Sequence, residues 1–85
     1  MKPRELLDRA RRGDVRNVRF GDLQRLVEAL GFRLDRVRGS HHTYRHPGVR
    51  AIVNLQRQGG QAKPYQVRQV VDLAARYALT VEDDA

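Results

Sequence analysis

The sequence predicts a small α+β domain in which two helices flank a three-stranded antiparallel sheet, preceded by an extra helical arm. Three observations lead to this order. Apolar residues recur at helical spacing in two separate stretches, aromatic and β-branched residues replace that period between them, and glycine or proline interrupts the middle stretch twice. Each core helix has one apolar stripe, so both helices are expected on one face of the sheet.

The chain is expected to divide into an arm (residues 1–17), a main domain (residues 18–80) and an acidic tail (residues 81–85) that contains Glu82, Asp83 and Asp84. At 85 residues it has no room for a second core. The arm is predicted to form a short helix that ends at Gly13. Its apolar side consists of Leu6, Leu7 and Ala10.

The two helices of the main domain are predicted by their apolar positions and their ends. In the first, Asp22 favours the start and Gly31 follows the end as a C-cap. In the second, Pro64 suits the first turn. The expected buried residues are Leu23, Leu26, Val27 and Leu30 in the first helix, and Val67, Val70, Val71, Ala74 and Ala78 in the second.

The strands are expected near Phe32–Val37, His41–His46 and Ala51–Leu55. Tight connections through Gly39 and through Pro47-Gly48 join them into a meander. Because strand side chains alternate between faces, Tyr44 and His42 are predicted to face the core. His41 then lies with Thr43 and Arg45 on the open face.

The charge of the chain favours a polyanionic partner. Seventeen Lys and Arg against ten Asp and Glu give a formal net charge of +7. Residues 36–71 contain no Asp or Glu at all, so a phosphate backbone would find cations there without repulsion. The chain has no cysteine, no apolar run long enough for a membrane span and no signal-peptide pattern, which favours a reducing cytoplasm.

The same stretch argues against a metal or another cofactor. It offers no carboxylate to hold Mg²⁺. The neighbouring residues His41 and His42 point to opposite faces, and His42 and His46 lie roughly 13 Å apart along an extended strand, too far to share an ion. Histidine alone can still move protons near neutral pH. Because RNA carries its own nucleophile in the 2′-hydroxyl, a histidine among cations points to RNA.

The sequence resembles the HicA family of bacterial toxins, small ribonucleases also described as YcfA-like. The resemblance runs from about Val18 to Leu79 and rests on "FGDLQRLVEALGF", "RVRGSHHTYRHP", "AIVNLQ" and "AKPYQVRQVV". It implies a fold similar to double-stranded-RNA-binding domains, cleavage of messenger RNA, and a HicB-like antitoxin as partner. It also implies a catalytic histidine, which falls on His41, with His42 as the alternative because the alignment of the doublet is ambiguous.

Two features depart from the shorter members of the family, namely the extra basic arm and the loop "QRQGGQAKP". The predicted mechanism has His41 assisting attack by the 2′-hydroxyl while cations hold the phosphate and a small-residue turn lets the RNA approach. The predicted RNA-binding residues are Arg36, Arg38, Gly39, Ser40, Arg45 and Lys63. Two alternatives stay open: a non-catalytic RNA-binding module, and a structural protein whose basic sheet docks an acidic partner.

Overall fold

The computed structural model describes residues 1–81, which form three helices and three strands. In chain order these are α1 (Pro3–Arg11), α2 (Phe20–Ala29), β1 (Arg33–Arg38), β2 (His41–His46), β3 (Val49–Gln56) and α3 (Pro64–Arg76). Within this described range, none of the helices has the length and apolar character needed to cross a membrane. The predicted acidic tail, with Glu82, Asp83 and Asp84, lies outside the described residues apart from Val81.

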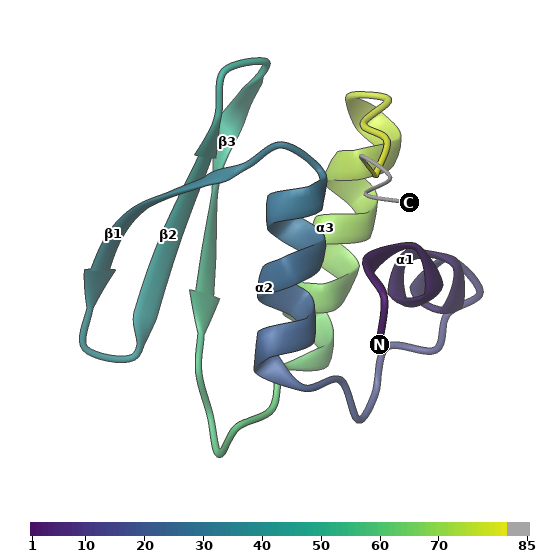
Figure 1. Cartoon of the computed structure of the whole chain (residues 1–85), viewed down its shortest axis with the longest axis horizontal. Coiled ribbons are helices and arrows are strands. Elements are labelled where there is room, and N and C mark those ends of the chain that lie inside the picture. Colours follow the sequence, from purple (N-terminus) through teal and green to yellow (C-terminus); the bar gives the residue numbers. More distant parts are fainter. Residues whose placement is uncertain (82–85) are drawn as a thin grey trace.

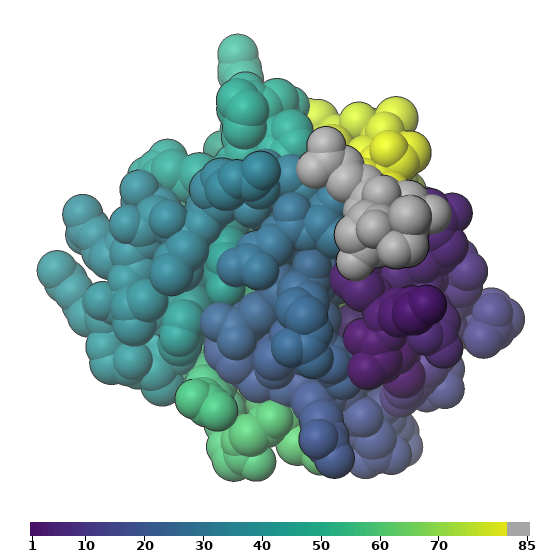
Figure 2. All heavy atoms as spheres, in the orientation of Figure 1, coloured from purple at the N-terminus to yellow at the C-terminus, as the bar shows by residue number. Residues whose placement is uncertain are grey.

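The elements form three layers. The strands pair antiparallel in the order β1-β2-β3, and α2 and α3 lie side by side on one face of the sheet (Figure 1). On the far side of these helices lies α1, which contacts both of them; the space-filling view shows the arm directly against α2 (Figure 2). The predicted α+β order of helix, sheet and helix, with an added helical arm, is therefore confirmed.

The strand boundaries differ slightly from those predicted. β1 begins at Arg33 because the backbone N–H of Phe32 still bonds to the end of α2, donating to the Val27 carbonyl at 3.2 Å. β3 is longer than predicted because Val49 already pairs with His46 across the Pro47-Gly48 connection. The connection between β1 and β2 is Gly39-Ser40, where Gly39 takes a φ of +59° that an L side chain rarely adopts.

Two layers of apolar side chains hold the elements together. The apolar sides of α2 and α3 pack against the inner face of the sheet, where Tyr44, Val53 and Leu55 are each at most 1% exposed. The predicted arm residues Leu6, Leu7 and Ala10 are also buried. Each large apolar side chain buried in this way contributes about 1.5–3 kcal/mol relative to an exposed one. The apolar stripes of α2 and α3 thus stabilise the fold together with the inner face of the sheet and the arm.

The end of α3 corrects one predicted core position. Ala78 was expected on the buried face but is exposed, because α3 ends at Arg76 and Ala78 takes a left-handed φ of +53°. Leu73, which the prediction left out, is buried, and Val71 is only half-buried. The helical spacing therefore holds only while the helix continues.

Candidate functional site

The histidine doublet lies at the first two positions of β2, at one end of the sheet. The β1–β2 connection, the last residues of β3 and the first turns of α2 and α3 lie at this same end (Figure 1). The two histidines point to opposite faces, as predicted. The ring of His42 packs against Phe20 of α2, whereas His41 reaches Asn54 on the open face. One end of the molecule thus gathers two histidines and four chain segments.

The imidazole of His42 is held from two sides. Its ring meets the Phe20 ring in a T-shaped contact with a centroid distance of 5.1 Å, and its Nδ1 lies 3.3 Å from the Ser40 carbonyl oxygen. A carbonyl can only accept a hydrogen bond, so Nδ1 carries the proton and Nε2 of the neutral ring keeps a lone pair. His42 is half-buried and is set up to accept a proton at Nε2.

His41 is more exposed, and within residues 1–81 its ring has a single side-chain hydrogen-bond partner. Its Nδ1 lies 3.3 Å from Oδ1 of Asn54 on β3. Its strand partners are Arg38 on β1 and Gln56 on β3, so a guanidinium-bearing residue lies directly opposite it. Lys63, just before α3, donates to Oε1 of Gln56 at 3.1 Å. His41 therefore has a cation on each side, Arg38 of β1 on one and Lys63, bound to Gln56 of β3, on the other.

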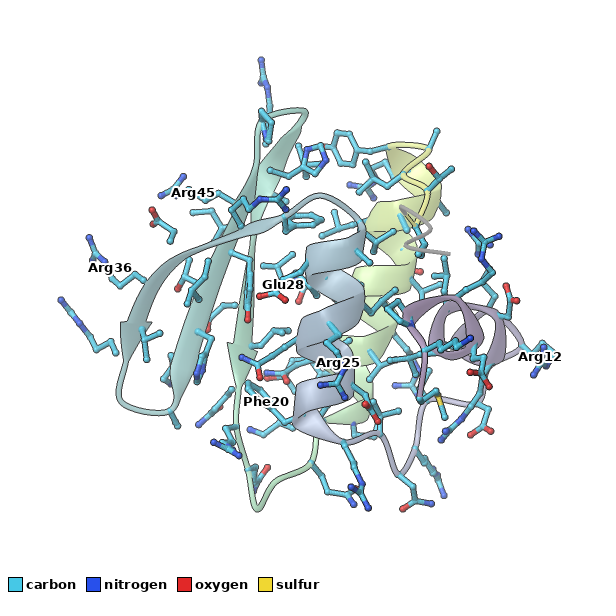
Figure 3. The ribbon with its side chains drawn as sticks, in the orientation of Figure 1. Arg12, Phe20, Arg25, Glu28, Arg36 and Arg45 are labelled. Carbon is cyan, nitrogen blue, oxygen red and sulfur yellow. The ribbon has the colours of Figure 1, made fainter. Side chains whose placement is uncertain are left out.

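The structure brings together most of the predicted RNA-binding residues. Arg38 lies opposite His41, the Gly39-Ser40 turn lies beside both histidines, and Lys63 is linked to this end through Gln56. Arg36 lies two residues before Arg38 on β1, opposite Thr43, and its side chain extends into solvent (Figure 3). These residues form a basic surface around the start of β2.

Arg45 is not brought to this end. It lies four residues after His41, roughly 13 Å along an extended strand, and its Nε is 3.1 Å from Oδ2 of Asp35 on β1. Figure 3 shows Arg45 at the opposite end of the strand from Phe20. Its part in holding the same phosphate as Lys63 therefore has no support in the geometry.

Two neighbours of His42 were missed as site residues. Arg57, just after β3, donates its backbone N–H to the Ser40 carbonyl at 3.0 Å, the same oxygen that His42 approaches. The Arg57 guanidinium carbon lies 5.8 Å from the centre of the Phe20 ring. Arg57 belongs to the acid-free stretch, so its charge was visible in the sequence. Nothing in the sequence connects Phe20 with His42, because only the packing of α2 on the sheet joins them.

On the helix side of the site, a tyrosine of the sheet meets a glutamine of α2. Tyr44, which follows His42 on the same face, accepts a hydrogen bond from Nε2 of Gln24 at 3.0 Å. Burial raises the pKa of the Tyr44 phenol, and the nearby Glu28 carboxylate raises it further, against the opposing effect of the Gln24 hydrogen bond.

Within residues 1–81, no three His, Asp or Glu side chains group closely enough to hold a metal ion.

Comparison with known proteins identifies the family. Residues 20–76, about two-thirds of the chain, match the family model described as the HicA toxin of bacterial toxin–antitoxin systems. Neither the curated proteins nor the solved structures gave a match. The matched range contains the histidine doublet, the whole sheet and both core helices, and it begins just after the arm. The chain therefore belongs to the HicA family of toxins from bacterial toxin–antitoxin systems.

Proposed function

We propose that this toxin is a metal-independent endoribonuclease that cleaves messenger RNA in the cytoplasm, with a histidine of the doublet as the proton-transfer group. The observation that carries the proposal is the fixed ring of His42 among cations at one end of the sheet. An imidazole whose Nδ1–H is held by a carbonyl has its Nε2 lone pair free to accept a proton. This is the group that RNA cleavage through the 2′-hydroxyl requires.

The proposed reaction uses the nucleophile that RNA itself carries. The histidine Nε2 removes the proton of the 2′-hydroxyl, and the 2′-oxygen attacks the adjacent phosphorus. The bond from phosphorus to the 5′-oxygen breaks, leaving a 2′,3′-cyclic phosphate, and the departing oxygen takes a proton from solvent. The imidazolium then returns its own proton to solvent. Cations around the phosphate stabilise the charge that develops on its oxygens.

The environment of the two rings favours His42 over His41 as this base. Catalysis depends on a group held in one geometry, and the His42 ring is fixed by Phe20 and by the Ser40 carbonyl. His41 is exposed, and in the described residues Asn54 is its only side-chain hydrogen-bond partner. This reverses the preference drawn from the sequence, where the open face favoured His41. His41 then acts beside Arg38 as a contact to the RNA backbone.

Phosphate binding is assigned to the cations and the turn around the doublet. Arg38 and Lys63 supply positive charge on the two sides of His41, and Arg36 extends the basic surface along β1. At Gly39 a Cβ would meet nothing within 4 Å, so the turn presents open space to an approaching backbone. The same surface is the proposed docking site for a HicB-like antitoxin, whose acidic groups would replace the phosphates.

The direct test is RNA cleavage by the purified protein in EDTA. We expect fragments from the wild type and from Arg12→Ala, an exposed cation on the arm, far from Phe20 in Figure 3. His42→Ala should leave the RNA intact, and His41→Ala should cleave more weakly than wild type. Circular dichroism confirms that each variant is folded. Intact RNA with folded wild-type protein would favour the non-catalytic RNA-binding module instead.

A further inference from the structure

A second cluster of arginines lies next to the histidine site but outside it. The N-terminus, the segment before α2, the first two turns of α2 and the loop after β3 line a hollow of about 400 Å³. Three of its lining residues are Arg19, Arg25 and Arg57. We call this site the arginine hollow. Figure 2 shows the loop after β3 (green) beside the start of α2 (blue) at the lower edge of the molecule.

Backbone hydrogen bonds hold the two walls of this hollow together. The N–H of Phe20 donates to the Gly60 carbonyl at 3.0 Å, and the N–H of Ala62 donates to the Val18 carbonyl at 2.8 Å. Arg19 itself forms a β-bridge with Gln61. The segment that carries Arg19 is therefore fixed to the loop that follows Arg57, although the two are far apart in the sequence. Their spacing depends on packed backbone, not on a mobile loop.

The charge of the hollow is only partly used inside the protein. Asp22 is a buried lining residue that forms ion pairs with Arg25 and with the N-terminal ammonium of Met1, at 3.5 Å, so its negative charge is compensated inside the protein. The guanidinium groups of Arg19 and Arg57 form no ion pair or hydrogen bond with any side chain in residues 1–81. Arg57 rests instead over the Phe20 ring. Two uncompensated cations facing one hollow favour an anion that comes from outside.

Arg57 connects this hollow to the histidine site. Its guanidinium and the imidazole of His42 contact the same Phe20 ring, at 5.8 and 5.1 Å from the ring centre. Its backbone N–H and His42 Nδ1 share the Ser40 carbonyl. The arginine hollow therefore lies directly beside the histidine site. Arg19 lies just outside the range that matches the family model.

We propose that the arginine hollow binds a backbone phosphate of the RNA next to the one that is cleaved, with Arg19 and Arg57 as its ligands. The inference rests on the proposed function for the identity of the RNA strand. It makes the segment that joins the arm to α2 part of the RNA-binding surface. Arg25 is then a positioning residue, because together with the Met1 ammonium it neutralises the Asp22 carboxylate that would otherwise repel the phosphate.

The test separates binding from cleavage by using 2′-O-methyl RNA, which keeps the phosphates but lacks the nucleophile. Binding of a fluorescent oligonucleotide is measured by anisotropy over a range of salt concentrations. For Arg19→Ala and for Arg57→Ala we expect about tenfold weaker binding at low salt, since each loses a charge-assisted contact. The slope of log affinity against log salt should also fall by about 0.7 for each lost contact to a single strand.

Arg12→Ala is the matched control, because it removes one exposed arginine from the arm without touching the hollow. If Arg19→Ala and Arg57→Ala bind with the affinity and salt slope of Arg12→Ala, the arginine hollow is not a phosphate site. Failure of the wild type to bind 2′-O-methyl RNA would overturn the inference as well. If the two variants weaken binding while wild-type protein leaves unmodified RNA intact, the phosphate site stands and the proposed cleavage fails.

Discussion

The two ends of β2 carry similar residues in opposite roles. At each end a histidine ring meets a phenylalanine in a T-shaped contact with a centroid distance of 5.1 Å, His42 with Phe20 and His46 with Phe32. The difference lies at Nδ1. In His46 this atom accepts a hydrogen bond from the Gly48 backbone N–H at 2.9 Å, whereas in His42 it faces the Ser40 carbonyl.

This difference decides what each neutral ring can do. In His42 the proton is on Nδ1 and the lone pair on Nε2. In His46 the Nδ1 lone pair accepts the hydrogen bond from the Gly48 N–H, so the proton is on Nε2. His46 therefore closes the Pro47-Gly48 connection, and the lone pair of its neutral ring is engaged by the Gly48 N–H. The cations follow the same division, since Arg45 is paired with Asp35 while Arg57 forms no ion pair in residues 1–81. The groups that contact each histidine, and not the residue type itself, decide whether it can take part in a reaction or only stabilises the fold.

Exchanging each histidine for alanine gives the largest expected effect. His42→Ala should lower the rate of RNA cleavage by about 10²- to 10⁴-fold, the usual contribution of a general acid or base. His46→Ala should keep the rate at temperatures where the protein is folded but lower its stability by roughly 1 kcal/mol through the lost hydrogen bond. Single-turnover cleavage and urea denaturation measure the two quantities. Equal rate losses in both variants would contradict the comparison.

A clash at the scaffold end should give the next largest effect. Gly31 has a φ of +102°, and a Cβ at this position would lie 2.8 Å from Nε2 of His46. Gly31→Ala should destabilise the protein by about 2–3 kcal/mol, because backbone strain adds to the displacement of a ring that Gly48 and Phe32 hold. The midpoint of urea unfolding measures it.

Gly13→Ala is the matched control for that change. Its φ of +92° is similarly strained, but a Cβ there meets nothing within 4 Å. The cost should therefore be strain alone, about 1 kcal/mol. The double variant Gly31→Ala/His46→Ala should lose less stability than the two single changes together, because the ring that clashes is gone. Simple additivity would show that the clash contributes nothing.

The sequence predicted the layers of this protein better than its site. Helical spacing identified Leu23, Leu26 and Val27 as buried residues of α2 but not Phe20, and strand alternation placed His42 and Tyr44 on the inner face. These are local patterns, and each depends only on the geometry of one element. The rest of the site depends on contacts between segments that are distant in the sequence, which no local pattern contains. Such contacts bring Phe20 against His42, and Arg19 and Arg57 into the same hollow. The sequence also placed Arg45 with His41 because both share a face, but a shared face says nothing of distance along the strand.

Removing the phenol of Tyr44 should have a smaller effect that depends on pH. Tyr44→Phe loses the hydrogen bond from Gln24 and should destabilise the protein by about 1 kcal/mol at neutral pH. The pKa of Tyr44 in the folded protein is raised above the usual 10.0 by burial. Below pH 10 the Tyr44 phenol is protonated in both the folded and the unfolded protein, and its contribution to the free energy of unfolding is complete. Above pH 10 the phenol ionises first in the unfolded chain, so the folded protein loses stability.

Urea unfolding of both proteins between pH 8 and pH 11 checks this sign. The wild type should lose stability more steeply than Tyr44→Phe above pH 10, so that the two curves approach each other. Parallel curves over the whole range would mean that Tyr44 ionises as easily in the folded protein as in the unfolded chain. The burial of its hydroxyl against α2 would then be incomplete.

The smallest expected effect comes from replacing Arg45, which tests whether the two ends of β2 have separate roles. Its ion pair with Asp35 is exposed at both side chains, and such pairs contribute about 0.2–1 kcal/mol. Arg45→Ala should therefore change stability and RNA affinity only slightly. Arg38→Ala, which removes the same group opposite His41, should weaken RNA binding clearly more, as anisotropy with 2′-O-methyl RNA would measure. If Arg45→Ala weakened binding as much as Arg38→Ala, the RNA would have to cover the whole length of the sheet, and the two ends of β2 would belong to one interface.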